Sequence, residues 1–145
     1  MTIVTDRIRL STRGDTDIHD LTPAVEGLVE RHRLQHGQVL VFVPGSTAGI
    51  TTLEHEPGLL RDLPAAFERL APRDLRYHHD ETWHDGNGHS HVRAALHGCS
   101  LTVPVENGHL LLGTWQQIIL IDFDNRPRQR DVVVQLSGET RSGAA

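Results

Sequence analysis

Histidine and carboxylate side chains gather in one short stretch of the chain, residues 78–91. Five of the eleven histidines fall there, interleaved with three carboxylates. Imidazoles exchange protons near neutral pH and bind divalent metals as neutral ligands, so this composition favours a metal site or a proton-transfer site. No apolar residue recurs along the stretch at a helical or strand period, and Gly86 and Gly88 mark a turn. We therefore predict a polar functional loop here.

The candidate metal ligands of this stretch are His79, His89 and His91. Three imidazoles leave an open coordination position on a divalent ion such as zinc or magnesium, which is the arrangement of a catalytic site. Asp80 or Asp85 would orient one of these imidazoles by a hydrogen bond to the ring nitrogen that does not bind the metal. His89 and His91 are also the candidate catalytic histidines.

A second candidate for ligand binding is the segment Pro44–Gly49, which follows the apolar run Gln38–Val43. The run is typical of a strand buried on both faces. Backbone N–H groups in a small-residue turn, together with the hydroxyls of Ser46 and Thr47, suit a phosphate group. A plain tight turn is the alternative interpretation.

The elements that must position these residues are mostly strands, and the helices occur singly. Strands are expected over 2–12, 38–43, 50–53, 100–105, 109–112, 118–123 and 132–136. Helices are expected from an N-cap at Thr22 toward Gly37, over 59–70 with a bend or a short first piece at Pro64, and over 88–97 between Asn87 and Gly98. This pattern predicts an α+β fold with a mainly antiparallel, β-sandwich-like sheet and a few single helices.

The expected helix over 88–97 matters for the two candidate histidines within it. On a strand, His89 and His91 would share one face, but in a helix their side chains diverge by roughly 200°. One of the two must then lie in a non-helical lead-in if both are to face the same ligand.

Length and composition narrow the class of protein. The 145 residues predict one domain over 1–140 and a disordered tail over 141–145. A net charge of −5 with only 14 basic residues disfavours a nucleic-acid surface, and the single Cys99 excludes an internal disulfide framework. No apolar run reaches the ~18–20 residues of a membrane span and no signal segment opens the chain, so we expect a soluble, cytoplasmic protein.

Several short blocks occur in a characteristic order along nearly the whole chain. They are Ser46–Ile50, Glu54–Leu59, Tyr77–Asp80, Asn87–His91, Val103–Gly108 and Leu112–Ile118, followed by Arg128 and Arg130. Together they closely resemble the YjbQ family, whose members are often labelled secondary thiamine-phosphate synthases. The Asn-x-His-x-His and Gly-Thr-Trp-Gln blocks are the specific ones.

The resemblance implies an α+β, β-sandwich-like subunit that assembles as a homotrimer, with its site near a subunit interface. It also implies a weak thiamine-phosphate synthase activity, which joins hydroxymethylpyrimidine diphosphate to a thiazole phosphate and releases diphosphate. Departure of diphosphate requires charge neutralisation by a divalent metal, cationic side chains or helix N-terminal amides. The candidate residues for binding such a small phosphorylated metabolite are Ser46, Thr47, Asn87, Trp115, Gln116, Arg128 and Arg130.

Trp115 and Gln116 would line the pocket, the indole stacking on a heteroaromatic ring and the amide forming hydrogen bonds. A place in the core or at the trimer interface is the alternative for Trp115. One departure from the family concerns Gly45, because relatives usually have His-Thr-Thr-Ala where this chain has Gly-Ser-Thr-Ala at 45–48. The glycine preserves backbone access for an anion but removes an imidazole.

Two other functions fit the same residues. One is a metal-dependent hydrolase of a small phosphorylated metabolite, with a metal-bound hydroxide and Glu54 or Asp62 as the base. The other is a non-catalytic ligand-binding trimer that lost activity together with the histidine at position 45.

Overall fold

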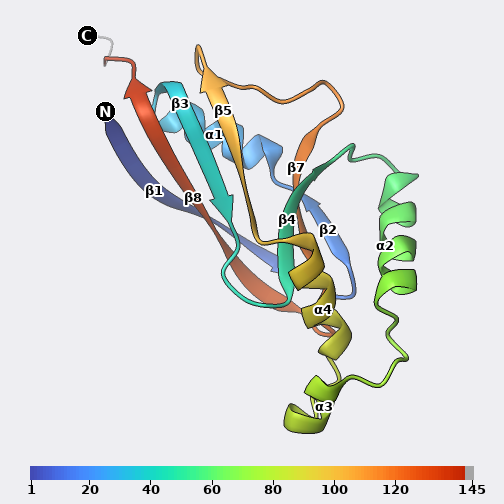
Figure 1. Cartoon of the computed structure of the whole chain (residues 1–145). Coiled ribbons are helices and arrows are strands. Elements are labelled where there is room, and N and C mark those ends of the chain that lie inside the picture. Colours follow the sequence, from blue (N-terminus) through green and yellow to red (C-terminus); the bar gives the residue numbers. More distant parts are fainter. Residues whose placement is uncertain (143–145) are drawn as a thin grey trace.

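Two antiparallel sheets and four helices make up the part of the chain that the computed structural model describes, residues 1–142 (Figure 1). The larger sheet has the strand order β1 (Thr2–Thr12), β8 (Arg128–Thr140), β3 (Leu34–Phe42), β5 (Ser100–Glu106) and β6 (His109–Leu110). The smaller sheet has the order β2 (Asp17–Asp20), β7 (Gln117–Asp122) and β4 (Ala48–Leu53). The predicted α+β class with mainly antiparallel strands is confirmed.

The main core lies between the two sheets and under helix α1 (Thr22–Arg31). Alternate residues of β8 point into it, so that Val132, Val134 and Leu136 are buried while their neighbours face outward. Val25 from α1 and Leu120 from β7 close the same cluster. This main core therefore joins both sheets.

Strand β7 is buried on both of its faces. Leu120 points into the main core, whereas Ile119 and Ile121 belong to a second cluster with Phe67 and Ala94. Phe67 comes from α2 (Leu59–Leu70) and Ala94 from α4 (Gly88–His97), so these two helices cover the side of the smaller sheet that faces away from the larger one.

Strand β3, not β7, was the strand expected to be buried on both faces, and this prediction is wrong. Val39 and Val41 are fully buried, but Leu40 is half-buried and Phe42 is 38% exposed. The smaller sheet covers the inner face of β3, and no described element of the chain covers its outer face. Both strands are apolar runs, and only the layer order distinguishes them.

Helix α3 (His78–Trp83) occupies the start of the stretch predicted to be a polar loop, so that prediction is wrong for these six residues. None of the residues of α3, all described, is buried. Figure 1 shows α3 at one end of the molecule beside the start of α4. The two are joined by Asp80, whose Oδ1 accepts a hydrogen bond of 2.9 Å from the Gly88 N–H.

Other helix ends differ from expectation in detail. Thr22 is not an N-cap, because Leu21 takes that position and the Thr22 hydroxyl accepts the Ile118 N–H at 2.8 Å. Helix α1 ends at Arg31, well before Gly37, because the chain enters β3 at Leu34. Helix α2 is one unbroken helix with Pro64 inside it rather than a short first piece followed by a second.

The end of the described chain is held in place. The Arg141 N–H donates to the Arg33 carbonyl at 2.9 Å, and its guanidinium pairs with Glu30 at 3.0 Å. Arg141 therefore contacts the folded part of the chain, residues 143–145 lie outside the described residues, and the disordered tail over 141–145 stays a prediction. Among the helices of the described chain, none has the length and apolar character needed to cross a membrane.

Candidate functional site

A cavity of about 390 Å³ opens where three parts of the fold meet. These are the turn between β3 and β4, the α3–α4 region, and the first residues of β8. Its lining contains seven of the predicted site residues: Ser46, Thr47, His79, Asn87, His91, Arg128 and Arg130. Gly45, Trp83 and Asp85 complete it.

The floor of the cavity is an ion pair between Arg130 and the fully buried Asp122. Arg130 donates from Nε to Asp122 Oδ2 at 2.7 Å and from Nη2 to Oδ1 at 2.9 Å. The Thr12 hydroxyl adds a third donor to this carboxylate at 2.6 Å. Because a buried charge is costly unless it is paired and hydrogen-bonded, this network holds the Arg130 side chain in one orientation.

One of the three nitrogen donors of the Arg130 guanidinium forms no hydrogen bond with the described residues. Nη2 also donates to the Thr47 hydroxyl at 2.8 Å, but Nη1 makes no hydrogen bond to any described residue. Nη1 lies beside Gly45, since a Cβ added at position 45 would be 3.0 Å from it. Glycine at this position, where φ is 116°, therefore leaves the cationic Nη1 open to the cavity.

A second ion pair lies next to the first. Arg128 Nε donates to the buried Asp124 Oδ2 at 2.7 Å, and the Thr47 hydroxyl donates to the same oxygen at 3.1 Å. Burial by itself would raise the pKa of Asp124, but the hydrogen bonds from Arg128, from the Asn125 N–H and from Asn87 hold this pKa below its ordinary value. Asp124 is thus a carboxylate at neutral pH, and Arg128 is held at the cavity edge.

Two imidazoles, from α3 and α4, line the same cavity as the two ion pairs. The rings of His79 and His91 have centroids 4.2 Å apart and are tilted by 45°. Burial, followed by the neighbouring His79, lowers the pKa of His91 below its ordinary value. His91 is therefore a neutral imidazole at pH 7, able to accept a proton or a hydrogen bond from a ligand.

The buried Asn87 amide connects these imidazoles with the ion pairs. Its Nδ2 lies 3.3 Å from Asp124 Oδ1. In the alternative orientation of the amide, the nitrogen donates instead to Asp85 Oδ1 at 3.0 Å and to His79 Nε2 at 3.2 Å. Asn87 does occupy the N-cap position of α4 as predicted, but its side chain does not cap the helix. The Asn87 side chain instead lines the cavity and hydrogen-bonds to other residues around it.

The three histidines predicted to hold one metal ion do not lie together. His89 is 2% exposed, and its Nε2 has no hydrogen-bond partner among the described residues. Its ring faces Tyr77, with centroids 6.3 Å apart, while His91 faces the cavity. Both histidines are inside α4, so their side chains diverge by the helical angle and no non-helical lead-in brings them together. Burial, then Arg93 and Arg73, lowers the pKa of His89.

Four other expected site residues are also away from the cavity. Glu54 follows β4 and is exposed, and Asp62 is exposed in the first turn of α2. Trp115 is 72% exposed in the segment before β7. Gln116 Oε1 accepts a hydrogen bond of 2.9 Å from the Gly113 N–H, and Gln116 Nε2 donates one of 3.2 Å to the Thr52 hydroxyl.

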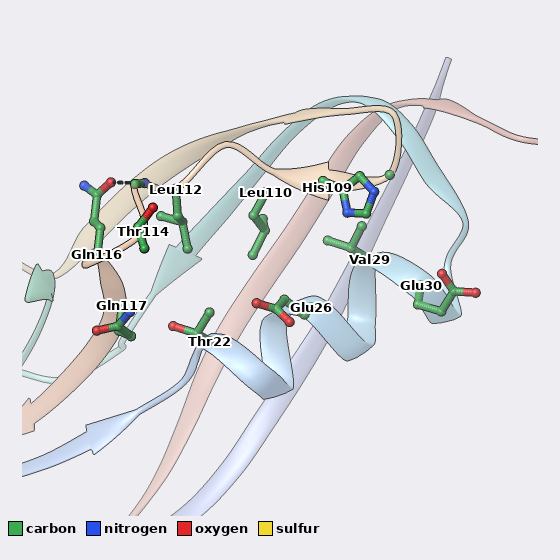
Figure 2. Close-up of a pocket in the computed structure, with 12 residues that line it drawn as sticks. Thr22, Glu26, Val29, Glu30, His109, Leu110, Leu112, Thr114, Gln116 and Gln117 are labelled. Carbon is green, nitrogen blue, oxygen red and sulfur yellow. Dashed lines mark hydrogen bonds between the residues drawn. The ribbon is translucent and has the colours of Figure 1, made fainter. Parts of the chain in front are cut away.

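Gln116 lines a different and slightly larger cavity, of about 440 Å³, between α1 and the segment 108–117 (Figure 2). Figure 2 shows Glu26 and Glu30 on helix α1, and His109, Leu110 and Leu112 on the segment across the cavity. Glu30 is paired with Arg141, but the Glu26 carboxylate forms no ion pair with a described residue and repels a phosphate group at this wall. The histidine cavity, with two arginines and two imidazoles, is therefore the better site for an anion despite its smaller volume.

Sequence reasoning missed three residues that matter in the cavity: Trp83, Asp122 and Asp124. Asp122 and Asp124 alternate at the end of an apolar strand, and Arg128 and Arg130 alternate at the start of the next one. This matched spacing of opposite charges across a short turn was the available signal. Trp83 is a lone aromatic residue in a polar stretch, and its type alone was the signal.

Comparisons with known proteins agree with this fold. The family model described as "UPF0047 protein YjbQ-like" matches residues 6–139. A UPF0047 protein of Archaeoglobus fulgidus is 41% identical over 128 residues, which is 88% of this chain and 97% of the relative. A UPF0047 protein of Methanothermobacter thermautotrophicus is 37% identical over 139 residues, or 96% of this chain and 95% of the relative.

Solved structures extend the likeness to three dimensions. The crystal structure of a YbjQ-like protein of unknown function from Sulfolobus solfataricus superimposes with a TM-score of 0.89 at 33% identity, covering 95% of this chain and 99% of the other. A hypothetical protein from Aeropyrum pernix gives a TM-score of 0.88 at 30% identity, with coverages of 94% and 99%. From the family match and these relatives together, the chain belongs to the UPF0047/YjbQ family.

Proposed function

We propose that the histidine cavity binds a small phosphorylated metabolite and that the protein is a transferase of the thiamine-phosphate synthase type. The reaction joins hydroxymethylpyrimidine diphosphate to a thiazole phosphate and releases diphosphate. The observation that carries the proposal is the free Nη1 of the buried Arg130 beside Gly45. A rigidly held cationic donor that opens into a cavity is a binding point for an anion.

The neighbouring groups support the same ligand. Arg128 stands two residues along β8, and Ser46 adds a hydroxyl from the β3–β4 turn. Asp85 is the carboxylate that faces the cavity from the lining, whereas Asp122 and Asp124 are each paired with an arginine. A phosphate or diphosphate group would therefore be recognised by hydrogen bonds from the guanidinium N–H groups that these pairs leave available, not by an excess of positive charge.

The reaction suits a site built for charge rather than for base catalysis. The carbon–oxygen bond to diphosphate breaks, the thiazole nitrogen supplies the electron pair of the new carbon–nitrogen bond, and the diphosphate leaves with its negative charge. No proton has to be removed from either substrate. Arg130 and Arg128 would stabilise the departing charge, and the neutral His91 would hydrogen-bond to the ligand.

A divalent metal, zinc or magnesium, was the cofactor expected from the sequence. His79, His91 and Asp85 line the cavity, and His79 Nε2 lies 3.6 Å from Asp85 Oδ1. Within residues 1–142, however, no three His, Cys, Asp or Glu side chains are arranged to hold a metal ion. Gly45 also brings no ligand. The residues present do not fit a preformed metal centre, and we assign no step to a metal.

Assembly as a homotrimer is likewise a proposal. The outer face of β3, with the half-buried Leu40 and the partly exposed Phe42, is a surface that a second copy would cover. Glu54 and Asp62 would take part in the reaction only where a neighbouring subunit brings them to the cavity. A hydrolase is the weaker alternative, because the two candidate bases lie outside the cavity of their own chain.

The test is formation of thiamine phosphate from the two substrates, with and without added Mg²⁺ or Zn²⁺. We expect product from the wild-type protein and at least a tenfold lower turnover for His91→Asn, with unchanged folding by circular dichroism. His78→Asn is the matched control, because His78 is fully exposed on α3 and outside the cavity. Binding of diphosphate without product under any metal condition would support the non-catalytic alternative and overturn the transferase.

A further inference from the structure

Trp83 is an exposed aromatic residue that lines the histidine cavity. It is the last residue of α3 and is 70% exposed. Single exposed apolar residues are ordinary on protein surfaces. Trp83 differs because its indole borders a cavity whose other walls are arginines, imidazoles and an aspartate.

Hydrogen bonds fix the backbone on both sides of Trp83. Helix α3 is joined to α4 by the hydrogen bond from the Gly88 N–H to Asp80. The helix ends immediately after Trp83, where His84 adopts a left-handed conformation with φ of 56° and donates its N–H to the Asp80 carbonyl at 2.8 Å. An indole on an anchored helix end presents a flat apolar face to a ligand at small cost in entropy.

We propose that Trp83 is a specificity-determining residue that stacks on the planar heteroaromatic ring of a ligand whose phosphate group lies at Arg128 and Arg130. This inference rests on the proposed function and names the chemical class of its ligand, a phosphorylated heteroaromatic compound. The two ends of the cavity then recognise different parts of one molecule. Phosphates without a ring would use only the arginine end and would bind more weakly.

The chain contains two tryptophans, which makes a direct optical test possible. In Trp115→Phe, all tryptophan fluorescence comes from Trp83. Hydroxymethylpyrimidine phosphate should quench this emission, whereas inorganic diphosphate should change it little. In Trp83→Phe, where Trp115 is the reporter, neither probe should quench.

Affinities complete the test. By calorimetry, Trp83→Leu should bind hydroxymethylpyrimidine phosphate about tenfold more weakly, with binding of inorganic diphosphate and glycerol 3-phosphate unchanged. Trp115→Leu, a matched change at an equally exposed indole, should alter none of these affinities. Weakening by Trp115→Leu instead would place the stacking residue elsewhere and overturn the assignment to Trp83.

The failure of this inference can be distinguished from failure of the proposed function. If diphosphate binds to the wild-type protein but Trp83→Leu leaves the affinity for the pyrimidine phosphate unchanged, the inference alone is wrong. If neither diphosphate nor the pyrimidine phosphate binds to the wild-type protein, both are wrong. Circular dichroism of each variant shows whether the fold is retained.

Discussion

Arg130 holds Asp122 through two parallel hydrogen bonds of 2.7 and 2.9 Å, and both residues are buried. This pair joins the start of β8 to the end of β7 and so connects the two sheets directly below the cavity. One guanidinium therefore has a structural half, paired with Asp122, and a half that is free for a ligand.

The structural half predicts a large loss of stability when the arginine is removed. Arg130→Met should lower the free energy of unfolding by about 3–5 kcal/mol, because it leaves Asp122 buried and unpaired. Urea unfolding measures this. Arg9→Met is the control, since Arg9 pairs with Asp131 in an exposed salt bridge and its loss should change stability little. Equal effects of the two changes would contradict the description of the cavity floor.

Introducing at position 45 the histidine that relatives usually have should weaken anion binding in this chain. Gly45 has φ of 116°, and a Cβ there would lie 3.0 Å from Arg130 Nη1. Gly45→His should therefore strain the backbone, at a cost of about 1–3 kcal/mol, and weaken diphosphate binding by crowding Nη1. Gly45→Ala is the matched control, because it brings the same strain and the same Cβ beside Nη1, so the difference between the two variants is the effect of the imidazole. A large gain in activity for Gly45→His alone would instead identify a decayed enzyme.

Local sequence signals were sufficient to predict the position of several strands and helices. The strand over 2–12 and the helix over 88–97 were predicted with the bounds that β1 and α4 have in the structure. Period-two alternation and a glycine after the helix are properties of neighbouring residues, so they can be read without knowing the fold. The turn at Asn107 and Gly108, both with positive φ, was predictable for the same reason.

The features that could not be predicted from the sequence depend on tertiary contacts. Nothing local shows that β7 rather than β3 has a layer on each face, because both are apolar runs. The divergence of His89 and His91 followed from helical geometry, but which of the two faces the cavity depends on where β8 and α3 lie. Nothing local distinguishes Asp122 from any other charged residue at the end of a strand, and only the pairing with Arg130 across the turn gives it a role.

The half-buried His97 predicts a loss of stability in mild acid. Burial lowers the pKa of His97, which packs against Phe67 and Phe123, below the ordinary value of 6.5. The unfolded chain therefore binds more protons than the folded chain as the pH falls through about 6.5, and the folded state loses stability there.

Replacing this histidine should remove part of that pH dependence. The difference in unfolding free energy between pH 7 and pH 5 should be smaller for His97→Asn than for the wild-type protein, whatever the stability of the variant at pH 7. His109→Asn, at an exposed position, should leave the difference unchanged. Urea unfolding at the two pH values is the measurement, and an unchanged difference for His97→Asn would show that another group is responsible.

The uncovered face of β3 predicts the outcome of a change at an assembly surface. If the protein is a homotrimer through this face, Phe42→Arg should lower the mass in light scattering from that of three chains to that of one, with the fold retained. Leu70→Arg is the control, because Leu70 is an equally apolar and more exposed residue on α2. A wild-type protein with the mass of one chain would exclude the trimer.

The Asn87 amide predicts how the cavity responds to an added negative charge. Asn87 lies between Asp124 on one side and Asp85 with His79 on the other. Asn87→Asp keeps the size of the side chain but places a third carboxylate within hydrogen-bond distance of these groups. Diphosphate binding should weaken by about tenfold or more, because like charges near 4 Å repel by about 1–4 kcal/mol. Asn87→Ala separates charge from the loss of the amide, since it removes the amide without adding charge and should weaken binding less. If calorimetry shows equal weakening for both variants, the amide contributes only position, and the electrostatic account of the cavity fails at this residue.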